Sequence, residues 1–382
     1  MSPALQDADN RRVDAAITEP CPPVDATITD YADLVGLRKE WARHEAVPVL
    51  VAAREDAADR SWAGLDVRTV VRGEQSAGRF AAHSVVLAPG AGMPTHYLED
   101  VHTYLLVAAG EAEFGVGSLV ETVGQHSLGY VPPRTRQSFR NACDAPVTLV
   151  LVHSQAGSDC AFAAAHQRWL ATGATDVADY QDMLELYGFR FDDEKLPNDE
   201  FTNIELPPLE FEFRGEGDMD ALRELFRSRS AVPRLVRTTP DELDTSVTGE
   251  TRRKQLLNGD VTGGNAMLNL LSGVPGFGAP RHHQPTEEEF FFITDGLLQM
   301  DCATEYVELR PGAIAFCPRN CTHGFRNTTE VEARFVTLNS PAGHERSMAA
   351  VRKLAQAGAT REQLYELSVA GGFVFHSHDA LG

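Results

Sequence analysis

The chain repeats itself, and this internal duplication constrains the fold more than any other feature of the sequence. The segment LRKEWARHEAVPVLV at 37–51 returns as LRELFRSRSAVPRLV at 222–236, which is 185 residues later. Similarly, GATDVADYQDMLELYGFRF at 173–191 returns as GATREQLYELSVAGGFVF at 358–375, again after 185 residues. A constant shift along most of the chain indicates two copies of one domain rather than chance similarity.

Each copy consists of short strands framed by helices. Apolar residues at helical spacing predict an opening helix at 30–44 in the first copy and at 217–229 in the second. Many short β-branched or aromatic runs follow, separated by Gly, Pro and Asn, which is typical of a β-sandwich or barrel. A helix pair is predicted to close each copy, over 160–172 with 177–188, and over 346–358 with 361–371.

The two copies also set the expected domain boundaries. We expect an N-terminal half over residues 1–200, with its barrel at about 47–155. The C-terminal half covers 201–382, with its barrel at about 232–341. The acidic, proline-bearing stretch 191–218 is interpreted as the linker, and its FEFR segment is a candidate edge strand.

The second copy carries four candidate metal ligands, which are His282, Gln284, Glu289 and His323. Residues two apart in a β-strand share a face, so His282 and Gln284 can point to the same side. Glu289 begins the apolar run EFFFI, and His323 follows the turn-like segment PRNCT. Imidazole and carboxylate groups from separate strands can hold a divalent metal and leave positions open for a substrate.

These residues stand in a pattern that resembles the two motifs of the cupin family. The first motif is Gly, five residues, His-x-His, three or four residues, Glu, six residues, Gly, and it falls on Gly276, His282, Gln284, Glu289 and Gly296. The second is Gly, five residues, Pro-x-Gly, two residues, His, three residues, Asn, and it falls on Gly312, Pro318, Asn320, His323 and Asn327. Gln284 and Asn320 depart from the family pattern.

With the duplication, the chain resembles a bicupin and is similar to the quercetinase-like dioxygenases. The resemblance implies a mainly β fold of two tandem jelly-roll barrels, each of which can hold a ligand inside. Each barrel is expected to have an N-terminal helix and a C-terminal helix pair beside it.

The first copy keeps the barrel register but not the ligands. Gly110, Pro132 and Asn141 precede their second-copy counterparts by 186 residues. The four ligand positions hold His96, Leu98, Thr103 and Gln137. A lone imidazole is not a tight site for a divalent metal, and His102 lies one residue out of register, so that only a bulge would turn it inward. We expect a degenerate site here. Three roles are then compatible with the first barrel: it is purely structural, it binds a small molecule without a metal, or it holds a metal through His96 and His102.

Several second-copy residues have two interpretations. Gln284 is a weak ligand whose amide can instead hydrogen-bond a metal-bound water or the substrate, and His283 is a rival ligand on the other face. Phe291 and Phe325 lie two residues beyond candidate ligands, so they either bind the substrate or form ordinary barrel core. Asn269, the polar residue of MLNLL, faces the substrate or the solvent.

Composition excludes some classes of partner. The net charge of −21 argues against nucleic acid and anionic membranes, and the sequence has neither a signal-peptide core nor an apolar run of about 18 residues. The six cysteines are scattered, as in a reduced protein, and Cys317, Cys321 and His323 lack the second ligand pair of a zinc finger. We expect a cytoplasmic protein with a small-molecule substrate, as a monomer or a homodimer.

The candidate ligands narrow the function. Two imidazoles and one carboxylate suit one divalent transition metal in the C-terminal barrel, Fe(II) before Mn, Ni, Co or Zn, and Glu289 is the candidate catalytic residue. The resemblance implies a non-haem, dioxygenase-type oxygenase that uses O₂ on a small aromatic or enolic substrate of secondary metabolism. The alternatives are a non-oxidative metal-dependent isomerase, cyclase or decarboxylase, and a non-catalytic bicupin that binds a small molecule.

Overall fold

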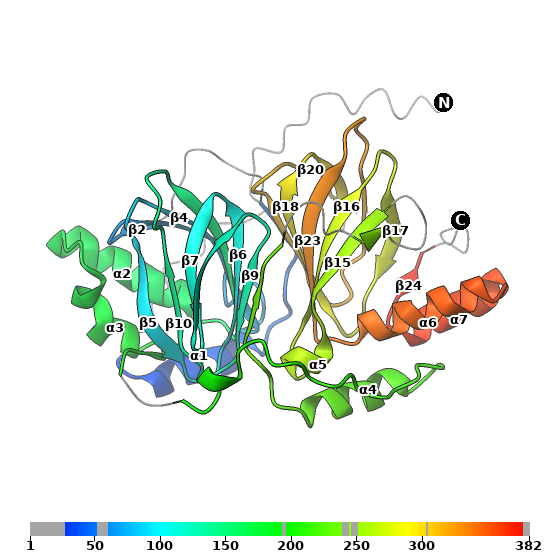
Figure 1. The fold of residues 1–382 in the computed structure, drawn as a ribbon, viewed down its shortest axis with the longest axis horizontal. Helices are drawn as coiled ribbons and strands as arrows, with labels where there is room; N and C mark the ends of the chain where they lie inside the picture. Colours follow the sequence, from blue (N-terminus) through cyan, green and yellow to red (C-terminus); the bar gives the residue numbers. More distant parts are fainter. Residues whose placement is uncertain are drawn as a thin grey trace.

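The computed structural model describes residues 27–51, 60–192, 196–238, 244–245, 251–302 and 305–376. These residues form two β-barrels that lie side by side (Figure 1). Each barrel consists of one seven-stranded and one five-stranded antiparallel sheet. The fold is therefore the mainly β pair of jelly-roll barrels that the sequence indicates.

The first barrel takes most of its strands from the first copy. Its seven-stranded sheet has the order β13, β9, β6, β11, β4, β3 and β2, with the bounds Arg234–Val236, Leu128–Val131, His102–Ala109, Val147–Ser154, Phe80–Leu87, Leu65–Val71 and Arg60–Trp62. Its five-stranded sheet has the order β12, β5, β10, β7 and β8, with the bounds Phe189–Arg190, Gly92–Leu98, Gln137–Arg140, Glu111–Val116 and Leu119–Gly124.

The second barrel has the same plan. Its seven-stranded sheet has the order β1, β21, β18, β23, β16, β15 and β14, with the bounds Val49–Val51, Ile314–Cys317, Glu288–Asp295, Ala333–Ser340, Met267–Gly273, Thr251–Leu257 and Asp244–Thr245. Its five-stranded sheet has the order β20, β19, β22, β17 and β24, with the bounds Glu305–Leu309, Leu298–Cys302, His323–Arg326, Gly278–His283 and Val374–Phe375.

The two copies exchange their first strands. Strand β1 of the first copy pairs with β21 of the second barrel, and β13 of the second copy pairs with β9 of the first barrel. Each barrel is therefore completed by the other copy. The proposed division near residue 200 remains a division of the sequence, because the sheets themselves cross it.

The seven-stranded sheets pack against each other through one apolar core. Phe80 of the first copy and Phe290 and Phe316 of the second lie at its centre, with ring centroids 5.2 Å apart for Phe80 and Phe290 and 4.7 Å apart for Phe290 and Phe316. Successive side chains of a strand alternate between its faces. Phe290 thus contacts the neighbouring barrel, whereas Phe291 and Glu289 belong to the inner face of the second barrel.

Helices cover the barrels at their outer ends and along one side (Figure 1). Their bounds are Tyr31–Trp41 for α1, Ser158–Thr172 for α2, Gln181–Glu185 for α3, Asp218–Arg227 for α4, Gly259–Thr262 for α5, His344–Gln356 for α6 and Arg361–Ala370 for α7. Two 3₁₀ turns lie at Val177–Tyr180 and Asp199–Phe201. None of the helices in the described ranges is both long and apolar enough to cross a membrane.

Two of the local predictions need correction. The helix predicted over 177–188 is a 3₁₀ turn followed by the short α3, which ends at Glu185. The candidate edge strand FEFR is wrong, because residues 211–214 form no strand. Phe211 and Phe213 instead pack against side chains of α4, α6 and α7, where Phe213 is buried and Phe211 is partly buried.

Candidate metal centre

Three of the candidate ligands converge inside the second barrel. His282 lies near the end of β17, Glu289 near the start of β18, and His323 begins β22. Each offers a ligand atom within 4.8 Å of the others, and all three are buried. His282 pairs with His323 across the strands, with ring centroids 4.4 Å apart, and His323 Nε2 lies 3.1 Å from Glu289 Oε2. We refer to these three residues as the His/Glu trio.

Backbone carbonyls orient both imidazoles. His282 Nδ1 lies 2.8 Å from the carbonyl oxygen of Pro280, and His323 Nδ1 lies 3.0 Å from that of Cys321. A carbonyl only accepts hydrogen bonds, so each Nδ1 carries a proton and each Nε2 is the nitrogen left to bind a metal, that of His323 once it has lost the proton it donates to Glu289. Carbonyls that fix the tautomer in this way commonly support metal-bound histidines. His282 Nε2 has no hydrogen-bond partner among the described residues.

The trio has an uneven charge distribution. Burial, together with the nearby His323, lowers the pKa of His282 to about 4, so this ring is neutral. Burial also acts to lower the pKa of His323, but the hydrogen bond and the charge of Glu289 prevail and raise it. Likewise, burial acts to raise the pKa of Glu289, but the bond with His323 prevails and lowers it. Without a metal, the proton of the trio therefore resides on His323.

Gln284 and His283 occupy different surroundings. Gln284 follows β17 and is 2% exposed. Its backbone carbonyl accepts a hydrogen bond from the backbone N–H of Asn320, whereas its side-chain Nε2 has no partner in the described part of the chain. Gln284 lies just beyond the strand that carries His282, and its buried amide without a partner keeps it a candidate fourth ligand. His283 points the other way, with Nδ1 3.2 Å from His376 Nε2, so the rival ligand lies outside the trio.

The predicted substrate-binding residues divide into two groups. Phe291 is fully buried and its ring centroid lies 6.1 Å from that of His323. Phe325 is half-buried and packs on Phe291, with 5.4 Å between the ring centroids. Both rings belong to the apolar core of the second barrel. Asn269 is 5% exposed and therefore does not face the solvent. Its Nδ2 lies 3.1 Å from the Met267 sulfur, and its Oδ1 has no partner among the described residues.

Sequence reasoning missed three residues around the trio. Asn339 stands opposite Glu289 in the ladder of β18 and β23. His344 begins α6, and its ring lies 4.2 Å from that of Phe373, which in turn stacks 5.0 Å from His282. Burial lowers the pKa of His344 to about 3, so this ring is neutral. The two copies end in a similar way, with GFRF at 188–191 and GGFVF at 371–375, and each ending contains a short strand that pairs with a barrel strand. This repeat could have pointed to Phe373.

The neighbouring carboxylates lie outside the trio. Glu288 turns toward the first barrel, where its Oε1 lies 2.6 Å from Arg79 Nε and 2.8 Å from Arg319 Nε. Glu287 Oε1 lies 2.5 Å from Arg223 Nη2. Both carboxylates are buried and paired with arginine, so they stabilise the structure around the trio rather than extend it.

The first barrel keeps the scaffold of the trio without its charges. His96 Nδ1 lies 2.8 Å from the Pro94 carbonyl oxygen, as in the second barrel. The other two positions form a neutral pair, in which Gln137 Nε2 donates to Thr103 Oγ1 at 3.2 Å. His102 instead stacks on Tyr130 and lies at the interface between the barrels. Within the described ranges, the first barrel holds no group of three metal-binding side chains like the trio.

The residues of the second barrel fit a divalent metal. Buried polar atoms around the trio lack hydrogen-bond partners among the described residues, namely His282 Nε2, Gln284 Nε2, Asn339 Nδ2 and His344 Nδ1. Each buried polar group left without a partner costs about 1–3 kcal/mol, so their clustering indicates a site that a metal, water or ligand completes. Two imidazoles and one carboxylate are the ligands that divalent transition metals prefer.

Comparisons with known proteins agree with this fold. Residues 272–339 match the cupin domain family. The chain is 39% identical to Protein SchB of Streptomyces halstedii over 62 residues, or 16% of this chain and 45% of SchB. It is 32% identical to the polyketide synthase CurC of Streptomyces cyaneus over 103 residues, or 27% of this chain and 67% of CurC. The matched stretch is thus less than half of SchB.

Solved structures resemble the chain over most of its length at low identity. The salicylate 1,2-dioxygenase of Pseudoaminobacter salicylatoxidans has a TM-score of 0.45 at 11% identity, covering 86% of this chain and 85% of its own. The oxalate decarboxylase of Bacillus subtilis has a TM-score of 0.45 at 14% identity, covering 82% and 85%. Procruciferin, an 11S globulin of Brassica napus, has a TM-score of 0.49 at 11% identity, covering 79% and 86%.

Proposed function

We propose that this chain, which belongs to the cupin family, is a metal-dependent enzyme whose second barrel acts on a small aromatic or enolic molecule. The observation that carries the proposal is the His/Glu trio, in which two imidazoles with fixed tautomers and one carboxylate lie within 4.8 Å of one another. The unpartnered polar atoms of Gln284, Asn339 and His344 around it support a ligand-binding site rather than closed core.

His282, Glu289 and His323 would hold the metal, and Gln284 is the fourth candidate ligand. Fe(II) suits this donor set best, and Mn, Ni, Co and Zn are the other candidates. An amide carbonyl is a weaker ligand than the imidazole in the family pattern, so Gln284 can give way to a substrate that binds through two oxygens. A divalent ion bound here would orient and polarise an enol or phenol oxygen.

The protein side chains then handle the proton of the substrate. In the metal-free protein the hydrogen bond from His323 outweighs burial and lowers the pKa of Glu289, so this carboxylate is ionised. A bound cation would replace that proton and hold Glu289 ionised in its stead, and Glu289 is our candidate to accept the hydroxyl proton of an enol. His344 is a second neutral base near the trio, with its ring 4.2 Å from that of Phe373 and its Nδ1 3.9 Å from Glu287 Oε2. Phe373 covers both His282 and His344 and would help to exclude water.

A dioxygenase-type reaction with O₂ is the first candidate, because two imidazoles and one carboxylate leave positions for both O₂ and substrate. A non-oxidative cyclisation is the second candidate. It is supported by the similarity to a protein named polyketide synthase, since polyketide intermediates are rich in enolisable ketones. Both reactions begin with the same deprotonation, so the trio serves either.

Elemental analysis of the purified full chain tests the proposal. Compared with wild type, His282→Ala should lose one equivalent of metal per chain. His96→Ala is the matched control, because His96 has the same carbonyl support in the first barrel, and it should lose none. Equal metal content in wild type and His282→Ala, also after reconstitution with Fe(II), Mn, Co, Ni or Zn, would contradict a metal enzyme at the trio.

Oxygen uptake separates the two reactions. An oxygenase should consume one O₂ per phenolic or poly-β-ketone substrate converted, and the rate should fall to background in the His282→Ala variant. A cyclase should convert the same substrates under anaerobic conditions. Metal-loaded protein that binds such compounds without converting them would leave the third alternative, a non-catalytic bicupin.

A further inference from the structure

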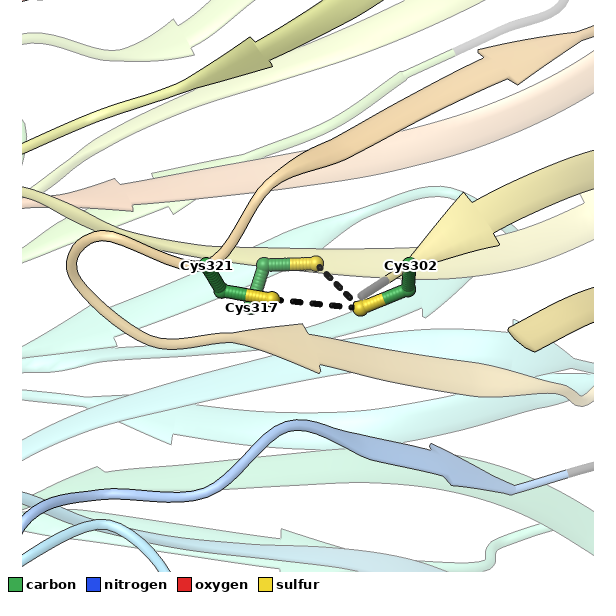
Figure 2. Close-up of side chains that lie close together, drawn as sticks. All are labelled: Cys302, Cys317 and Cys321. Atoms are coloured by element: carbon green, nitrogen blue, oxygen red, sulfur yellow. Dashed lines mark hydrogen bonds between the residues drawn. The ribbon is translucent and has the colours of Figure 1, made fainter. Parts of the chain in front are cut away.

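We infer that Cys302, Cys317 and Cys321 form a second metal site, for a soft thiophilic cation of the Zn²⁺ or Cu(I) class, beside the His/Glu trio. The three thiols come from the end of β19, the end of β21 and the turn after it, and their side chains point toward one another (Figure 2). We refer to these residues as the thiol trio. The proposed function of the His/Glu trio does not use them.

The spacing of the sulfurs suits one bound ion. All three sulfurs lie within 4.8 Å of one another, with 3.8 Å from Cys302 Sγ to Cys317 Sγ and 3.4 Å from Cys302 Sγ to Cys321 Sγ. Zinc holds thiolates at about 2.3 Å, and ligands at that distance in tetrahedral directions stand about 3.8 Å apart. These two separations are thus within about 0.4 Å of this value, and a cation can bind if the sulfurs move by no more than about 1 Å.

The surroundings favour a soft cation over a hard one. Cys302 and Cys317 are each 1% exposed and lie in the apolar core of the second barrel, with Met300 beside them. Cys321 is only half-buried, so an ion can reach the thiol trio from that side. Thiolates select Zn²⁺ and Cu(I) over Mg²⁺ or Ca²⁺, which need oxygen ligands.

The duplication argues against a mere packing role for these cysteines. The first-copy positions that correspond to Cys302, Cys317 and Cys321 hold Val116, Val131 and Thr135. Val116 and Val131 fill the core of the first barrel without any sulfur. Apolar packing alone therefore does not require cysteine at these places, and the three thiols occur together in the barrel that also carries the His/Glu trio.

The thiol trio lies against the His/Glu trio. Cys302 stands opposite His323 in the ladder of β19 and β22, and Cys317 stands opposite Glu289 in that of β21 and β18. The carbonyl of Cys321 accepts the hydrogen bond from His323 Nδ1. A cation on the three sulfurs would thus fix the turn that orients His323, so we assign the thiol site a structural role toward the first metal.

Cobalt binding tests the inference in the full chain. The protein is stripped of metal under anaerobic, reducing conditions and titrated with Co²⁺, whose thiolate complexes absorb in the near ultraviolet. The wild type should show this charge-transfer absorption saturating by two equivalents, because the His/Glu trio also takes up Co²⁺, and Zn²⁺ should abolish it by displacement. The double variant His282→Ala/Glu289→Gln should keep the absorption, because it alters only the other site. A parallel titration with Cu(I) shows which soft ion binds tighter.

Single cysteine variants localise the absorption. Cys302→Ser and Cys321→Ser should each abolish it, whereas Cys160→Ser, which changes a buried cysteine beside the first barrel, should leave it unchanged. Cys321 is half-buried, so its variant should fold even where a core variant does not. Three results would overturn the inference. The first is a reduced wild type that shows no cobalt-thiolate absorption and binds no Cu(I). The others are absorption that survives both variants and a Cys302–Cys321 disulfide in the metal-free native protein.

Discussion

Metal binding at the His/Glu trio should depend on a single proton between about pH 5 and 6.5. In the metal-free protein the bond with Glu289 raises the pKa of His323 above its ordinary value of 6.5, while burial and the neighbouring His323 lower that of His282 to about 4. Glu289 has a lowered pKa and stays ionised over this range. A metal ion must therefore displace one proton, from His323, and none from the other two ligands.

The expected magnitude follows from this proton count. Displacing one proton weakens the apparent affinity tenfold for each pH unit below the pKa of His323, or about 1.4 kcal/mol per unit. From about pH 6.5 to 5.5 the dissociation constant should thus rise about tenfold. Below about pH 4 the protonation of His282 should make the dependence steeper. The stabilisation that the metal-free protein gains from protonated His323 should be complete below pH 6.5 and fade as the pH rises through the raised pKa.

Competition with a chromophoric chelator at a series of pH values measures this slope, and proton release in a weakly buffered solution measures the same number independently. Glu289→Gln is the informative variant, because loss of the negative charge should lower the pKa of His323 and move the pH-dependent region downward. A slope of two above pH 5 would refute the reasoning, since it would require both histidines to be protonated alike. A slope of zero would refute the proton on His323.

Three further outcomes are expected. His344→Gln should lower kcat by about a hundredfold with unchanged metal content, because a neutral base beside the trio is lost while the ligands remain; turnover and elemental analysis measure this. Glu288→Gln leaves Arg79 and Arg319 without their shared carboxylate, and should cost about 2 kcal/mol in urea unfolding without loss of metal. Phe80→Ala opens the core between the barrels and should cost about 3–5 kcal/mol in the same assay.

Features that depend on local periodicity could be predicted from the sequence. The duplication and the turn residues indicated two barrels, and the period of two in a strand separated the ligands from their neighbours. By this period His283 and His102 were predicted to point away from the ligand positions, and in the structure they lie against His376 and Tyr130. Strand spacing and the resemblance to the cupin motifs together predicted that His282, Glu289 and His323 form one group, and their ligand atoms lie within 4.8 Å of one another.

Features that depend on long-range contacts could not be predicted in this way. The exchange of β1 and β13 joins strands of opposite copies, and no spacing within one copy specifies it. His344 reaches the site from the helix after the barrel. Cys302 lies 15 residues before Cys317 and outside both motifs, so the sequence offered two cysteines and one histidine where the structure gathers three thiols.

The comparison of the two barrels separates what the fold provides from what individual residues provide. The carbonyls of Pro94 and Pro280 hold His96 and His282 in the same tautomer, and Phe189 and Phe373 cover these rings in the same way. An oriented imidazole under an aromatic ring is therefore a property of the barrel.

The charged pair of His323 and Glu289, in contrast, depends on the residues at only two positions of the barrel. In the first barrel Gln137 and Thr103 satisfy each other as neutral groups, which leaves one imidazole and nothing to attract a cation. In the second barrel His323 and Glu289 share a proton that a metal can replace. Because the scaffold is common to both barrels, we propose that these two positions decide which barrel binds a divalent ion. The first barrel contributes to the second through their shared core and exchanged strands.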